Sequence, residues 1–240
     1  MATVNAETSK EVRPNFLFIT NFKTYKEGSA DGSVALVEQH LEAAKQFPDV
    51  QIFCAVQALD LLYIRTNLGD AISRVSNFGL LAQHIDPVGY GSFTGQINPE
   101  RLVQLGAKGT LLNHSERRLE RYELLKSIEL AKGLGLKTIV CCESAEEGRS
   151  LLELQPDYLA LEPPELIGGD ISVSKAEADL IDRTLKAVGP GCNLLVGAGV
   201  KDRDDISIAV EMGACGVLVA SGVVKAADPK LALLDMLKGF

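Results

Sequence analysis

Eight short apolar runs recur along the 240-residue chain, and stretches with helical periodicity lie between several of them. The runs are rich in residues that favour strands, whereas residues 34–44 and 119–130 place their apolar side chains on one stripe of a helix. Strands that alternate with helices form a parallel sheet, so this repeat limits the fold to a few α/β architectures. We expect strands at residues 16–19, 52–56, 79–83, 109–113, 138–141, 158–161, 193–197 and 216–220.

The length of the chain favours a closed barrel. Eight strand–helix units in about 250 residues are typical of a (β/α)8 barrel. An open doubly wound sheet is the alternative, but no G-x-G-x-x-G follows the first expected strand, and Asn21-Phe22-Lys23 stands there instead. We therefore predict an α/β fold with a single (β/α)8 barrel at residues 15–240, preceded by a short leader at residues 1–14.

Composition and charge exclude several classes of protein. With 46% hydrophobic and 23% charged residues, the chain is globular. A formal charge of −8 argues against nucleic acid or an anionic membrane surface as a partner. The five cysteines are odd in number and lie at or beside apolar runs, which indicates reduced thiols and a cytoplasmic location. The adjacent pair Cys141-Cys142 lacks the spacing of a metal site.

In a parallel barrel the carboxyl ends of the strands meet at one face, where catalysis takes place. Glu162 directly follows the sixth expected strand, with two prolines behind it and Gly168-Gly169 a few residues later. The prolines stiffen the start of this loop, and the glycines make its end flexible. A carboxylate beneath such a loop is suited to act as a general base under a lid that closes.

Small residues follow the seventh and eighth expected strands. These are Gly197-Ala198-Gly199 and Ala220-Ser221-Gly222. Small side chains let backbone N–H groups approach an anion, and barrels often bind phosphate after strands seven and eight. The alternative is that the glycines only form turns.

Lys23 and His114 follow the first and fourth expected strands. Lys23 can pair with an anionic substrate, although a lysine after a strand is often only solvated. His114 precedes Ser115, which we interpret as a helix N-cap, and the positive end of a helix dipole favours a neutral imidazole. A neutral imidazole can donate a hydrogen bond to a carbonyl oxygen. The alternative for His114 is a core or capping role, and that role is the preferred interpretation for His84. With Glu162, these groups suit proton abstraction next to the carbonyl of a small phosphorylated sugar, with no metal or cofactor.

Four stretches resemble the triosephosphate isomerase family, and the resemblance covers about residues 15–240. The length and the lid sequence resemble its compact, archaeal-type branch. The four stretches are Asn21-Phe22-Lys23, Asn113-His114-Ser115-Glu116-Arg117-Arg118, Leu161-Glu162-Pro163 and Gly91-Ser92-Phe93-Thr94-Gly95.

The resemblance implies interconversion of dihydroxyacetone phosphate and glyceraldehyde 3-phosphate. A carboxylate base paired with a neutral histidine is the known arrangement of this family, so these roles are carried over. Lys23 is then the electrostatic residue, His114 the electrophile and Glu162 the base. The resemblance also implies a homodimer or homotetramer in which residues 91–95 insert into a neighbouring subunit. By the same resemblance, Asn21 and Glu116 support Lys23, and Ser115 lies beside the base. The residues implied to bind phosphate through their backbones are Gly168, Gly199, Ala220 and Ser221.

The chain departs from the family's pattern at the end of the lid, where Gly168-Gly169-Asp170 replaces Gly-Thr-Gly. Gln96 also stands where the family commonly has a glutamate. These changes leave a non-catalytic barrel that binds a phosphometabolite as the alternative function. Another barrel enzyme, acting on an amino-sugar or indole phosphate, is a second alternative, and the His-Ser-Glu-Arg-Arg stretch argues against it.

Overall fold

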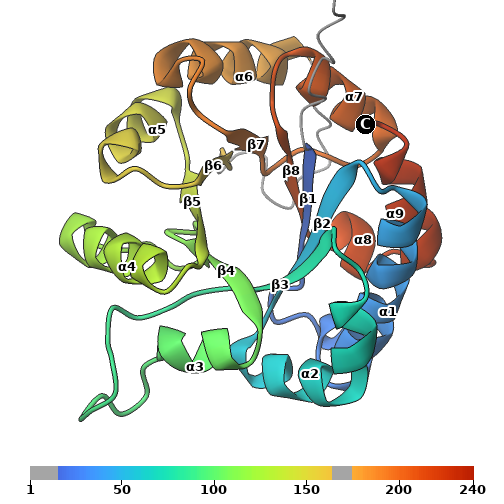
Figure 1. The fold of residues 1–240 in the computed structure, drawn as a ribbon. Helices are drawn as coiled ribbons and strands as arrows, with labels where there is room; N and C mark the ends of the chain where they lie inside the picture. Colours follow the sequence, from blue (N-terminus) through green and yellow to red (C-terminus); the bar gives the residue numbers. More distant parts are fainter. Residues whose placement is uncertain (1–15, 164–174) are drawn as a thin grey trace, which may run out of the picture.

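The computed structural model describes residues 16–163 and 175–240, and its eight parallel strands close into a barrel. The strands pair in chain order, and β8 pairs with β1 (Figure 1). This closure confirms the predicted barrel and excludes the open sheet. The strands are β1 (Phe16–Asn21), β2 (Val50–Val56), β3 (Phe78–Ala82), β4 (Ala107–Leu112), β5 (Lys137–Cys142), β6 (Tyr158–Leu161), β7 (Leu194–Val196) and β8 (Gly216–Val219).

Helices surround the barrel, as Figure 1 shows. Each strand position predicted from the apolar runs is confirmed within a few residues. The described helices are η1 (Lys26–Gly28), α1 (Asp31–Gln46), α2 (Ala58–Ser73), α3 (Pro99–Gln104), α4 (Arg121–Gly133), α5 (Ala145–Leu151), η2 (Leu152–Leu154), α6 (Lys175–Val188), α7 (Arg203–Glu211), α8 (Ser221–Val224) and α9 (Pro229–Leu237).

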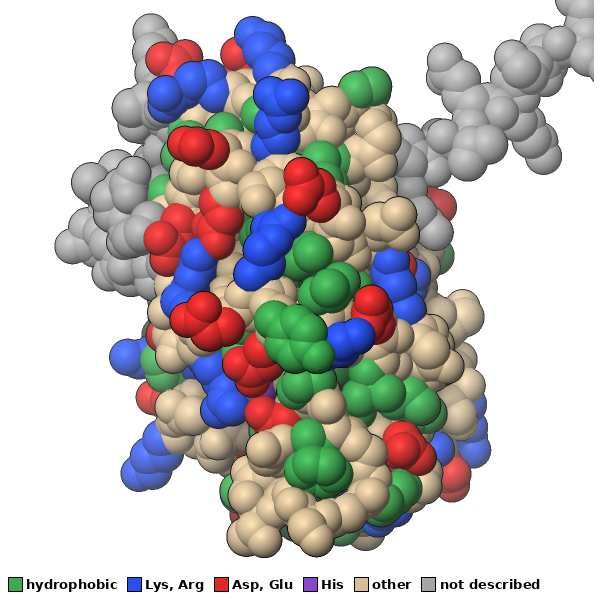
Figure 2. All heavy atoms as spheres, turned by 90° about the vertical axis from the view of Figure 1, so that its left-hand side faces the viewer, with side chains coloured by type: hydrophobic (Ala, Val, Ile, Leu, Met, Phe, Trp, Pro, Cys, Tyr) green, Lys and Arg blue, Asp and Glu red, His purple; other side chains and the backbone are tan. Residues whose placement is uncertain are grey.

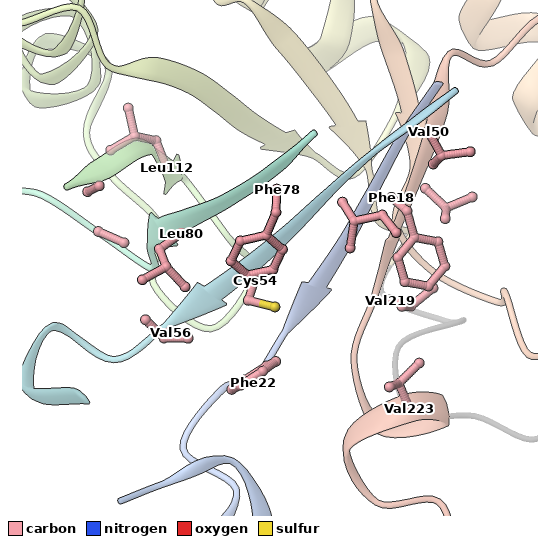
Figure 3. Packing of buried hydrophobic residues seen from close by; sticks show 14 of the residues in the cluster. Phe18, Phe22, Val50, Cys54, Val56, Phe78, Leu80, Leu112, Val219 and Val223 are labelled. Atoms are coloured by element: carbon pink, nitrogen blue, oxygen red, sulfur yellow. The ribbon is translucent and has the colours of Figure 1, made fainter. Parts of the chain in front are cut away.

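Two apolar layers hold the barrel together, because successive side chains of a strand point to opposite faces. Leu17 and Ile19 of β1 pack inside the barrel, together with Phe53 of β2. Phe18, between the two β1 residues, packs in the larger layer under the helices, part of which Figure 3 shows. The strands are therefore buried on both faces, which explains their continuous apolar sequences.

Close contact between the first and last strands closes the barrel. A Cβ atom on Gly216 of β8 would lie 1.9 Å from the carbonyl oxygen of Leu17 in β1. Only glycine permits this approach, so the identity of residue 216 is set by the backbone of the neighbouring strand.

The apolar stripe predicted for residues 119–130 is partly wrong. Helix α4 begins at Arg121, after Leu119, and Tyr122 is 73% exposed. The helix instead buries Leu124 and Ile128, along with the small residues Ser127 and Ala131. The prediction assigned large apolar side chains to the buried face, whereas two of the four buried positions hold small residues.

The predicted leader lies outside the described residues. None of the described helices is both long enough and apolar enough to cross a bilayer. On the face that Figure 2 shows, acidic and basic side chains are interspersed with apolar ones. The negative net charge is therefore not gathered into a single acidic area on this face.

Candidate active site

The three predicted reactive side chains lie at the carboxyl ends of β1, β4 and β6 and form a connected group. The Nζ atom of Lys23 lies 2.8 Å from Oε1 of Glu116. The other carboxylate oxygen of Glu116 is 3.6 Å from Nδ1 of His114, whose Nε2 is 3.3 Å from Oε1 of Glu162. Lys23 and Glu116 are 93 positions apart in the sequence, and Glu116 and Glu162 are 46 positions apart. The fold nevertheless brings all three into one site.

Lys23 is held in place by its own backbone as well as by Glu116. Its φ angle is +46°, in the left-handed region that non-glycine residues seldom adopt. The backbone N–H of Lys23 donates to Oδ1 of Asn21 at 3.0 Å, so Asn21 supports this conformation. The Lys23 side chain is only 13% exposed, and the Glu116 carboxylate keeps its ammonium group at the mouth of the barrel.

Gln83, which follows β3, belongs to this site although its role was not predicted. Its side-chain NH2 group donates to the carbonyl oxygen of Lys23 at 2.9 Å and to that of Ala55 at 3.2 Å. It also lies 3.3 Å from Oδ1 of Asn21. Gln83 therefore joins the ends of β1, β2 and β3 and fixes the turn that carries Lys23. Its position directly after the third apolar run was the available signal.

The tautomer of His114 is set by a backbone hydrogen bond. The N–H of Glu116 donates to Nδ1 of His114 at 3.1 Å, so Nδ1 accepts and a neutral ring carries its proton on Nε2. That N–H faces the site, because Nε2 is the atom nearest Glu162. A neutral His114 is thus oriented to donate a hydrogen bond toward a substrate oxygen.

The helix N-cap predicted at Ser115 is wrong. Residues 115–117 form a turn, closed by the N–H of Arg117 donating to the His114 carbonyl at 2.7 Å, and α4 begins only at Arg121. The local hydrogen bond from Glu116, and not a helix dipole, accounts for the form of the imidazole. Within the described residues, the buried Oγ atom of Ser115 has no hydrogen-bond partner.

The turn after His114 is anchored to the next strand. Asn113 has φ +57°, and its Nδ2 donates to the carbonyl of Cys141 at 3.0 Å. Arg118 forms an ion pair with Glu147 and lies 3.6 Å from Glu143, so it ties the turn to the end of β5. Arg118 therefore holds the loop of His114 in place.

Glu162 is buried, with 5% of the residue exposed. Considering the described residues alone, neither its Oε2 atom nor Nε2 of His114 has a hydrogen-bond partner. Unpartnered buried polar groups are costly, so these two atoms indicate a place for a polar ligand. The Cys141 thiol packs nearby, and burial, followed by the charge of Glu162, raises its pKa so that it remains protonated.

Gly197, just past β7, gives Glu162 its space. A Cβ atom at this position would lie 2.5 Å from Cγ of Glu162 and 3.2 Å from the Leu161 carbonyl oxygen. Such a contact is too short to exist, so a larger residue must displace the carboxylate.

We expect Gly197→Ala to lower kcat/KM by about 100-fold, because a shift of about 1 Å in a reacting group can cost this much. Thermal unfolding followed by circular dichroism measures how much stability accompanies the change. Gly191→Ala is the matched control, since a Cβ atom there meets no heavy atom within 4 Å. An unchanged kcat/KM in Gly197→Ala would show that the carboxylate position is not critical.

The structure places three of the four predicted phosphate-binding residues after the last two strands. Gly199 has φ +76°, a conformation that suits glycine. Ala220 precedes the short helix α8, which begins at Ser221. The first N–H groups of a helix have no carbonyl partner within it and can face an anion. Gly168, like Gly169 and Asp170 of the altered lid, lies outside the described residues.

A cavity of about 430 Å³ opens beside Lys23 and His114. It is also lined by Gln83, Ile97 and Arg117, and it extends over the ends of β1 to β4. Among the described residues, no three His, Cys, Asp or Glu side chains are grouped so that they could hold a metal ion.

The sequence model of the triosephosphate isomerase family matches residues 16–239. The chain belongs to the triosephosphate isomerase family. It is 39% identical to the triosephosphate isomerase of Methanobacterium bryantii over 229 residues, and this alignment covers 94% of this chain and 97% of that protein. It is 41% identical over 221 residues to the triosephosphate isomerase of Archaeoglobus fulgidus, covering 91% and 95% of the two chains. These archaeal relatives confirm the resemblance found in the sequence, and the closed barrel is that of a TIM barrel.

Proposed function

We propose that this chain is an isomerase that interconverts dihydroxyacetone phosphate and D-glyceraldehyde 3-phosphate, a step of glycolysis and gluconeogenesis. The observation that carries the proposal is the connected group of Lys23, Glu116, His114 and Glu162 in a chain of this family. The group contains a base, a neutral hydrogen-bond donor and a cation at one barrel mouth.

The reaction follows from the positions of these groups. Oε2 of Glu162 removes a proton from the carbon next to the substrate carbonyl, and the carbonyl oxygen becomes an enediolate oxygen. Nε2–H of His114 and the Lys23 ammonium stabilise the negative charge on that oxygen. The hydroxyl proton of the enediolate passes to the former carbonyl oxygen, and Glu162 returns its proton to the neighbouring carbon, so that the aldehyde and the ketone are exchanged.

The substrate phosphate binds to the backbone N–H groups near Gly199, Ala220 and Ser221, and Gly168, the fourth residue of this prediction, lies outside the described residues. Asn21 and Glu116 position Lys23, and the family resemblance assigns Ser115 a position beside the base. The reaction requires no cofactor, since proton transfer and charge stabilisation are supplied by side chains.

The test is an assay of the purified protein with glyceraldehyde 3-phosphate, in comparison with its Glu162→Gln variant. Turnover no faster than that of the variant would remove the proposal. Binding of a phosphorylated triose without turnover, measured by titration calorimetry, would favour the non-catalytic alternative. That alternative has no specific support, because the base and the lysine are both present.

The chain also forms a homodimer or homotetramer through residues 91–95. Tyr90, directly before this loop, and Phe93 within it are 65% and 44% exposed among the described residues. Large apolar side chains grouped on one loop are typical of a contact with another subunit. We place the protein in the cytoplasm, because its five cysteines are all free thiols.

We expect light scattering to give a mass of at least twice the 25.7 kDa of one chain. The variant Phe93→Asp should shift this mass toward that of a monomer, since a charge in an apolar interface is costly. Leu231→Asp on α9 is the control, because Leu231 is 64% exposed and lies away from the loop. A monomeric wild-type protein at micromolar concentration would contradict the assembly.

A further inference from the structure

A second cavity, of about 450 Å³, opens at the opposite end of the barrel, where the strands begin. It shares no residue with the cavity beside Lys23. Its lining comes from β2 to β5 and from the segments just before β3, β5 and β6, and it includes Lys108, Lys132, Lys137 and Asp157. Three lysines and one carboxylate therefore surround one opening in a chain whose net charge is −8.

A bulge in the sheet brings Lys108 to this opening. Leu80 of β3 pairs with Ala107 of β4, but the next residue, Leu81, pairs with Gly109. Lys108 is the extra residue of the bulge, and bulges redirect side chains. The Cγ atom of Lys108 lies 3.1 Å from the place of a Cβ atom on Gly79, so the lysine crosses the space that a larger residue 79 would fill.

The other two lysines reach the cavity from the end of α4 and the start of β5. Lys132 is in the last turn of α4, and Lys137 is the first residue of β5. The Lys137 ammonium lies 5.8 Å from the centre of the Tyr158 ring. Within residues 16–163 and 175–240, none of these three lysines is in an ion pair.

The carboxylate of Asp157 offsets only one of the three lysine charges in the lining, and hydrogen bonds hold it at Thr138. Its Oδ2 atom accepts hydrogen bonds from the backbone N–H and from the hydroxyl of Thr138, both at 2.8 Å. Like charges brought together around a cavity repel one another, and an anion between them relieves this repulsion. The base of the cavity is apolar, because the buried rings of Phe53 and Phe78 line it.

We propose that this amino-end cavity binds a compact polyanion, a small metabolite that carries at least two negative charges as phosphates or carboxylates. Its volume lies within the range of about 300–1,000 Å³ that is usual for sites of small ligands. Lysine ammonium groups on flexible stems suit such ligands, because each acts as a point charge that adapts to the anion. The site is separate from catalysis, so its occupation does not require the proposed isomerase activity.

The test is titration calorimetry of the full chain with pyrophosphate and with citrate. We expect wild-type protein to bind at least one of them, and the tighter of the two identifies phosphates or carboxylates as the preferred class. The triple variant Lys108→Gln, Lys132→Gln, Lys137→Gln should bind it at least about tenfold more weakly, since it loses three of the charges that attract the anion. The wild-type dissociation constant should rise with salt.

Two controls distinguish binding at this cavity from nonspecific attraction to lysines and from binding at the active site. The triple variant Lys45→Gln, Lys186→Gln, Lys230→Gln loses the same charge from exposed positions on α1, α6 and α9, and it should bind as the wild type does. Lys23→Gln should also retain binding at the amino-end cavity. Thermal unfolding checks that each variant is folded. The proposal is overturned if neither probe binds the wild type, or if the Lys108 triple variant binds the probe as well as the wild type does. It is also overturned if both triple variants lose binding equally, or if only Lys23→Gln loses binding.

Discussion

We expect Glu162→Gln to lower kcat by about 1,000-fold, because general base catalysis contributes about 10²–10⁴-fold and an amide cannot accept the proton. The amide keeps the size of the carboxylate, and the site keeps Lys23 and His114, so KM should change little. A lower kcat with nearly constant KM is the signature of an interaction used in the transition state. Steady-state kinetics in both directions of the reaction measures the two constants.

Two further variants make this result specific. Glu162→Asp keeps the charge but withdraws the carboxylate by one methylene, so it should lose about 100-fold. Glu153→Gln removes a carboxylate that is 74% exposed and pairs with Arg121 at the surface, and it should retain full activity. A Glu162→Gln enzyme that keeps more than about a tenth of the wild-type kcat would mean that another group takes the proton.

The sequence was sufficient to predict the barrel and to bring three candidate side chains to one face, and their catalytic roles stay a prediction. Each strand is buried on both faces, so it appears as a continuous apolar run, and the strand ends can be located without the structure. Since parallel strand ends meet at one face, the residues after them are brought together whatever their separation in sequence. This is why Lys23, His114 and Glu162 could be placed in one site, and their contacts through Glu116 agree with that expectation.

The supporting residues could not be predicted because they act through geometry. Gln83 binds three groups at the ends of β1 and β2, and its position after an apolar run indicates a place near the site but not these contacts. Gly197 matters because Glu162 occupies the space of its absent side chain, which only coordinates reveal. The error at Ser115 has the same origin, since a serine after a histidine fits a turn as well as a helix start. The bulge at Lys108 depends on the register of two strands and leaves no trace in sequence.

We expect Lys23→Asn to lower kcat/KM by about 1,000-fold without reducing stability. Two unit charges about 4 Å apart interact by about 4 kcal/mol at an effective dielectric near 20, which corresponds to roughly three orders of magnitude in rate. Both constants should change, because the ammonium attracts the anionic substrate and stabilises the enediolate oxygen. The expected result is therefore a higher KM together with a lower kcat, unlike the result for Glu162→Gln.

The stability of Lys23→Asn follows from the backbone. Residue 23 has φ +46°, and asparagine adopts this left-handed conformation more readily than lysine. The loss of the pair with Glu116 costs little, because the carboxylate of Glu116 is 58% exposed. Lys26→Asn, which removes an exposed charge nearby, should leave kcat/KM within about twofold. A Lys23→Asn protein that unfolds at a clearly lower temperature would show that the lysine supports the fold. An unchanged or higher unfolding temperature with lost activity means that this backbone strain is maintained for catalysis.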